Sequence, residues 1–139
     1  MKTALRVVAG VVVGLVVSFI LVVAVEMIGA VVHPTPEGFG GTTEEMCRHV
    51  EGIPPWFLAV AAALWAATAF VGTWIARKIG NVYAAAAVGL LLVAGVVFNV
   101  AMLPYPLWFK VGTLLAILIA VTVGSRWTTL RKAGAGNAP

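Results

Sequence analysis

The feature that most constrains this chain is a set of four long apolar runs that are almost free of charge. The first extends from Val7 to Val25 without a charged residue. These nineteen residues are enough to cross a bilayer as a helix, because the hydrocarbon core is about 30 Å thick and a helix rises about 1.5 Å per residue. Charged residues make up only 10% of the 139 residues, whereas about a quarter of a soluble domain is charged. The sequence therefore predicts an integral membrane protein.

Prolines mark the ends of the predicted spans. Pro34 stops the first run, and the Pro54–Pro55 pair suits the first turn of the second. The predicted fold is an all-α integral membrane four-helix bundle with spans at about 6–32, 55–76, 81–103 and 106–124. We expect a single transmembrane domain over residues 1–127, and a flexible cytoplasmic tail over residues 128–139, which are rich in Gly and Ala.

Lysine and arginine residues are divided unequally between the two sides of these spans. Seven fall on the side that holds both termini, namely Lys2, Arg6, Arg77, Lys78, Arg126, Arg131 and Lys132. Only Arg48 and Lys110 fall on the other side. Because positive residues in short loops stay in the cytoplasm, we expect a multi-pass protein with both termini cytoplasmic, in the inner (plasma) membrane if the cell is bacterial.

Small residues recur at helical spacing, which lets helices approach closely in lipid. We expect helix packing through Gly10, Gly14, Gly112, Ala116, Ala120 and Gly124. The stripe on the last span suits packing inside one bundle, a homo-oligomer or a membrane-protein partner, besides the lipid bilayer itself. Four of the five tryptophans fall near span ends, as interfacial anchors do, and Trp65 is the exception. The basic residues are scattered, which excludes nucleic acid as a partner.

Four polar residues are predicted to converge near the outer edge of the membrane. Glu26 lies nineteen residues beyond Val7, which places it about 28 Å across the hydrocarbon core. Asn99 reaches nearly the same depth on the third span, and Lys110 lies about one turn into the fourth. His33 lies seven residues after Glu26, on the same helix face. The candidate intramembrane polar site therefore comprises Glu26, Asn99, Lys110 and His33.

The chemistry of this cluster is open to three interpretations. A Glu26–Lys110 pair with the amide of Asn99 satisfies its own hydrogen bonds and locks three helices together. In the second interpretation Glu26 binds and releases a proton or a cation, because ionisable groups inside membranes are often functional. In the third, Glu26 simply points into the lipid headgroups.

The loop after the first span contains a predicted short amphipathic helix at 43–51, TEEMCRHVE, with Thr42 or Thr43 as its cap. Such a helix suits a lid that lies on the outer membrane face. Cys47 and His49 are two positions apart, so on a helix they point about 200° from each other and do not hold one metal ion together.

Three motifs occur together along the chain: VEMIG at 25–29 followed by HPTP at 33–36, a second span that opens at Pro54 and closes in IAR, and NVAMLPYPLWF at 99–109. In this combination, over about residues 5–127, the chain resembles an uncharacterised family of small bacterial four-helix inner-membrane proteins. The resemblance implies the fold and the location, and it implies no established activity.

The function predicted first is that of a non-enzymatic membrane protein with a structural or accessory role, which associates with itself or with other membrane proteins. The alternative is a small proton- or cation-coupled transporter or channel that uses Glu26. A third is a sensor of metal or redox state that uses His33, Cys47 and His49. The sequence has no Asp, hydrolase motif, phosphate loop or Cys-x-x-Cys, so we predict no catalytic residue, cofactor or metal site.

Overall fold

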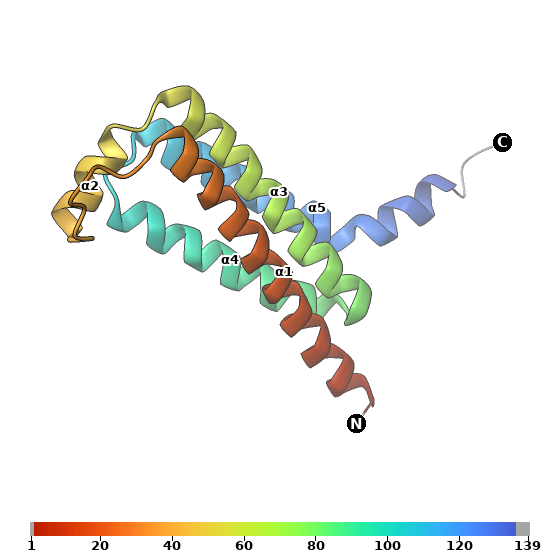
Figure 1. Cartoon of the computed structure of the whole chain (residues 1–139). Helices are drawn as coiled ribbons and strands as arrows, with labels where there is room; N and C mark the ends of the chain where they lie inside the picture. The colour runs from red at the N-terminus through yellow and green to blue at the C-terminus, as the bar shows by residue number, and fades with distance from the viewer. Residues whose placement is uncertain (1, 136–139) are drawn as a thin grey trace.

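The structure, a computed structural model, describes residues 2–135, and the surroundings of side chains from residue 3 to residue 127. In this range the chain forms five helices: α1 (Lys2–Val32), α2 (Thr43–Glu51), α3 (Pro55–Ile79), α4 (Val82–Met102) and α5 (Leu107–Ala135). All but the short α2 are long and apolar enough to cross a membrane, and they pack as a bundle (Figure 1). The predicted all-α architecture, with a short helix between the first two spans, is confirmed.

The helices begin at short-range signals in the sequence. The hydroxyl of Thr42 accepts a hydrogen bond from the backbone N–H of Glu45 at 3.3 Å, and the Glu45 carboxylate accepts one from the backbone N–H of Thr42 at 3.0 Å. This reciprocal pair caps α2. Pro55 opens α3, and the side-chain oxygen of Asn81 caps α4 by accepting from the backbone N–H of Tyr83 at 2.9 Å. Because these signals are local, they can be recognised in the sequence.

The last helix is longer than the predicted fourth span. Its apolar part ends at Trp127, yet the helix continues to Ala135, beyond the predicted end at residue 124. This extension takes up part of the segment expected to form a tail, and it leads away from the bundle (Figure 1). No proline interrupts the chain there, so the backbone can continue its helical hydrogen bonds. The rest of the predicted tail, residues 136–139, lies outside the described residues.

The four long helices run alternately up and down, and α3 is central to them. It contacts α1, α4 and α5, whereas α1 and α5 do not contact each other within the described residues. Both described chain ends lie at the end of the bundle opposite α2 (Figure 1). We call the half of the bundle remote from α2 the basal half and the other the α2 half.

The basal half is tightly packed because glycines bring α1 and α3 together. A Cβ atom added at Gly10 would lie 2.8 Å from both the Ala76 carbonyl oxygen and the Gly80 Cα, and one added at Gly14 would lie 2.9 Å from the Gly72 carbonyl oxygen. The adjoining core, formed by Ala76, Ala84 and Val88, is 0% exposed. Apolar side chains from α1 and α4 pack against it, namely Val7, Val11, Leu15 and Leu92.

The small residues of α5 fall into two groups. An added Cβ at Gly124 would lie 2.7 Å from the carbonyl oxygen of Phe70, so this end of α5 packs on the backbone of α3. At Gly112 nothing lies within 4 Å of an added Cβ, and the residue is exposed. Ala116 and Ala120 are half-buried. The predicted packing stripe therefore contacts the bundle at one end and is open at the other.

In the α2 half, α1 and α4 separate. In the basal half, Val7, Val11 and Leu15 of α1 meet the core around Val88. From there the two helices diverge toward α2 (Figure 1). A cavity lies between them, and residues of α3 and α5 complete its lining.

Candidate functional site

A cavity of about 430 Å³ lies under α2, where the four long helices end. Its polar lining comes from α1, α2, α3, α4 and the connecting segments, namely Glu26, His33, Thr35, His49, Trp65, Asn99 and Tyr105. We call it the α2 cavity. A second cavity of about 250 Å³, the gap cavity, continues between α1 and α4 toward the middle of the bundle. The two cavities share Glu26, Trp65 and Asn99, so these three side chains lie where they meet.

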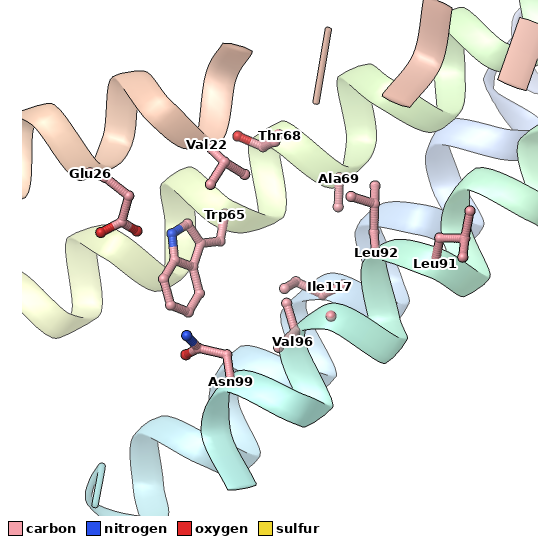
Figure 2. A pocket seen from close by; sticks show the side chains of 11 residues that line it. Val22, Glu26, Trp65, Thr68, Ala69, Leu91, Leu92, Val96, Asn99 and Ile117 are labelled. Carbon is pink, nitrogen blue, oxygen red and sulfur yellow. The ribbon is translucent and has the colours of Figure 1, made fainter. Parts of the chain in front are cut away.

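Three helices supply this shared group. Figure 2 shows the Glu26 carboxylate from α1 facing the indole of Trp65 on α3, with Asn99 from α4 on the other side of the ring. Trp65 Nε1 and Asn99 Oδ1 are buried and have no hydrogen-bond partner within the described structure. Glu26 forms no salt bridge with any described residue. The Glu26 carboxylate is the acceptor that lies toward the indole N–H of Trp65, whereas the amide oxygen of Asn99 has no such neighbour. Since buried polar atoms are normally paired, these three side chains form the candidate site.

Two aromatic side chains that line the α2 cavity, Trp65 and Tyr105, pack against Phe109 of α5, which lies behind them. The ring centroids of Tyr105 and Phe109 are 4.7 Å apart, and those of Trp65 and Phe109 are 5.9 Å apart. Burial raises the pKa of Tyr105 to about 12, and the negative charge of Glu26 acts in the same direction. Tyr105 therefore keeps its proton at neutral pH, and its hydroxyl is a neutral donor and acceptor in the cavity.

A histidine pair holds α2 over the α2 cavity. The rings of His33 and His49 stack with centroids 4.4 Å apart, and His33 Nε2 donates a hydrogen bond to the carbonyl oxygen of His49 at 3.1 Å. Val50, on the same helix, is only 5% exposed. Burial lowers the pKa of His49, and the positive charge of His33 lowers it further. The folded arrangement thus favours the uncharged form of His49.

The pKa of His49 predicts that α2 loosens in mild acid. The pKa of His49 in the folded protein lies below its ordinary value of about 6.5. Neutral His49 therefore stabilises the fold fully above about pH 6.5, and this stability is lost as the pH falls through the lower folded-state pKa. Hydrogen bonds from Thr42 lower the pKa of Glu45, so the cap of α2 stays charged in this window. A nitroxide on Cys47, the single cysteine, should therefore become more mobile between pH 7.5 and pH 5.

The control for this titration is His33→Phe. This variant keeps an aromatic ring against His49 but removes the positive charge of His33. The acid-induced gain in mobility should be smaller in this variant. Other charged or titratable groups line the spaces on either side of the pair, namely Glu26, Glu37, Glu45, Arg48 and Tyr105. Equal mobility at both pH values in the unmodified protein would show that the histidine pair does not hold α2.

Of the four residues predicted to converge, the structure brings three together. Glu26, Asn99 and His33 all line the α2 cavity. Lys110 lines neither this cavity nor the gap cavity, and the described residues show no salt bridge between it and Glu26. The reason is the arrangement of helices: Lys110 lies on α5, which does not contact α1.

Three site residues were not assigned to the site from the sequence: Trp65, Tyr105 and His49. Trp65 carried a usable signal, because it is the tryptophan far from a span end. Tyr105 lies between two prolines in the turn before α5, which also marks an unusual position. Among the described residues, no group of three or more His, Cys, Asp or Glu side chains is arranged to hold a metal ion.

Comparison with known proteins adds no family to this description. No protein-family model matches the chain, and neither does a curated protein or a solved structure. The resemblance to small bacterial four-helix inner-membrane proteins therefore stays a prediction. The structure describes a small multi-pass membrane protein with four candidate spans. Three of these spans supply the polar side chains Glu26, Trp65 and Asn99.

Proposed function

We propose that this protein is a non-enzymatic membrane protein that binds a cation at Glu26, in the α2 half of the bundle. The observation that carries the proposal is a carboxylate without an ion pair, which lies beside an indole N–H and an amide oxygen that lack partners. A carboxylate inside a membrane span is costly unless a positive charge or a proton neutralises it. The two adjoining cavities provide room for such a group.

The lining of the cavities favours a cation over an anion. Glu26 is the one charged side chain that lines both, and no Lys or Arg of the described residues lines either. Aromatic faces and the oxygens of Asn99 and Tyr105 also suit a positive group. The close packing of the basal half and the position of the α2 cavity support access from the α2 side. The proposal extends to a proton- or cation-coupled transport role. Such a role needs a second conformation in which the site is open at the base.

We further propose that the α2 side faces away from the cytoplasm. Basic residues support this orientation, since they gather at the basal end of the spans, at Arg6, Arg77, Lys78 and Arg126. Both termini are then cytoplasmic, and in a bacterium the membrane is the inner one. A cation would enter the α2 cavity from the outside.

A titration of the full chain with butylammonium chloride tests the proposal. Trp65 is made the only tryptophan by phenylalanine replacements at Trp56, Trp74, Trp108 and Trp127. A cation at Glu26 lies beside the indole of Trp65, so we expect a saturable change in its fluorescence. Sodium chloride at the same concentration should give no such change. A response to butylammonium that is absent or never saturates would exclude a cation site.

The structural or accessory role is the second proposal, and it has its own supporting observation. The exposed end of the α5 stripe at Gly112 leaves open space where another helix could approach. The mass of the detergent-solubilised protein, measured with and without Gly112→Leu, tests this role. A monomer in both cases, with no protein partner recovered, would oppose it.

A further inference from the structure

The gap cavity opens sideways, between α1 and α4, rather than only toward α2. Nothing lies within 4 Å of a Cβ added at Gly95, which lines this cavity. Its neighbour along α4, Leu91, is 52% exposed. Val22 and Glu26 of α1 line the cavity on one side, and residues 91–99 of α4 line it on the other, where the two helices diverge toward α2 (Figure 1). The space between these two helices is a lateral opening. In a bilayer, that opening faces the lipid of the leaflet on the α2 side.

The polarity of the opening changes along its length. The polar groups lie at its α2 end, where Glu26, Trp65 and Asn99 meet. The part nearer the basal half is lined by one threonine, Thr68, and otherwise by apolar side chains, namely Val22, Ala69, Leu91, Leu92, Val96 and Ile117 (Figure 2). A lipid in the adjoining leaflet has the same order along the same direction, with its headgroup toward the α2 side and its chains toward the membrane centre.

We propose that the occupant is an amphiphile with an ammonium headgroup, which enters from the leaflet through the opening between α1 and α4. The proposal rests on the cation site at Glu26 and names its ligand class and its route. The ammonium group lies at the Glu26 carboxylate and donates to Asn99 Oδ1, which otherwise has no partner. An oxygen of the headgroup accepts from Trp65 Nε1, and the alkyl chain lies against the apolar wall of α4.

Charge selects among amphiphiles at this position. A phosphatidylglycerol headgroup is anionic, and where the two cavities meet it would face the Glu26 carboxylate, with no Lys or Arg of the described residues lining either cavity. An ethanolamine headgroup offers the ammonium and, on its phosphate, an acceptor for the indole N–H. The same ammonium chemistry is available from a free amine that enters from the water under α2, so the experiment must separate these two sources.

The test uses the full chain with Trp65 as its only tryptophan, in lipid nanodiscs. One set contains phosphatidylethanolamine with bromine on the chains, and the other contains phosphatidylglycerol brominated in the same way. Bromine quenches a tryptophan only at contact, so Trp65 reports a chain in the gap cavity. We expect the ethanolamine lipid to quench Trp65 about twice as strongly as the glycerol lipid. Equal quenching by both would overturn the proposal.

A variant that fills the opening checks the route. Gly95→Leu places a side chain in the lateral opening. Its Cβ has no neighbour within 4 Å, and leucine favours a helix over glycine, so the protein should fold. The difference between the two lipids should disappear. Ala94→Leu is the matched control, because Ala94 is exposed on the same helix and lines neither cavity, and it should keep the difference.

The possible failures are distinguishable. If butylammonium binds equally well in the Gly95→Leu protein and the lipids show no headgroup preference, the ligand is a soluble amine from under α2, and only the lateral route falls. If butylammonium does not bind at all, the cation site falls too. If neither lipid quenches Trp65 and the protein elutes as a dimer, a second copy of the chain fills the opening. That result overturns the proposal of an amphiphilic ligand.

Discussion

Glu26→Gln is expected to weaken butylammonium binding about 30-fold or more, with helical content and thermal unfolding unchanged. Glutamine has almost the shape of glutamate but no charge, so the variant removes the anionic group that the two cavities share. Glu26 is exposed to the cavities, so the loss is that of a hydrogen bond to a charged group, about 1.5–3 kcal/mol, and about 1.4 kcal/mol is a factor of ten in affinity. The titration of Trp65 fluorescence measures the loss.

The matched control is Glu51→Gln, which removes a carboxylate of the same kind from the exposed surface of α2. Glu51 lines neither the α2 cavity nor the gap cavity, so the affinity should stay within about twofold of the unmodified protein. If both variants weaken binding equally, general surface charge attracts the amine. If Glu26→Gln keeps full affinity, the carboxylate is not the cation ligand.

Gly10→Ala is expected to destabilise the protein by about 1–3 kcal/mol. The new methyl group would lie 2.8 Å from the Ala76 carbonyl oxygen and the Gly80 Cα, and backbone atoms cannot move aside as a flexible side chain can. Overpacking of this kind costs about 1–3 kcal/mol even though alanine favours a helix more than glycine does. Unfolding in mixed micelles with increasing SDS measures the change in free energy.

Gly112→Ala is the matched control, and the expected sign is the opposite. Nothing lies within 4 Å of the added methyl group, so only the helix preference remains, and it stabilises by about 1 kcal/mol. If the two Gly→Ala substitutions change the free energy of unfolding in opposite directions, the contacts of each glycine, and not its helix preference, decide the effect. If Gly10→Ala also stabilises, then α1 does not pack on α3 through this glycine.

The helices could be predicted from the sequence because lipid allows few alternatives. In the hydrocarbon core the backbone polar groups must be satisfied within the helix, so an uncharged run of sufficient length has one outcome. The short α2 was predicted for another reason. Its cap is formed by Thr42 and Glu45, which are three residues apart, and it needs no partner elsewhere in the fold.

The candidate site could be predicted only in part. Depth along a helix follows from the rise per residue, which is why Glu26 and Asn99 were expected at one level and do line one cavity. The direction in which each side chain points could not be predicted in the same way. Helices that are apolar on all sides carry almost no signal for which face meets which neighbour. Lys110 was therefore grouped with Glu26, and Trp65 was left out.

The glycine contacts between α1 and α3 hold one end of α1, and further contacts with α3 hold the other. Glu26 lies twelve residues beyond Gly14, which is about 18 Å along the helix. Next to Glu26, Val25 is only 7% exposed, and a Cβ added at Gly29 would lie 3.6 Å from the Phe57 ring. The carboxylate and the indole of Trp65 therefore belong to one packed pair of helices, and a ligand would meet them as a unit that is already in place.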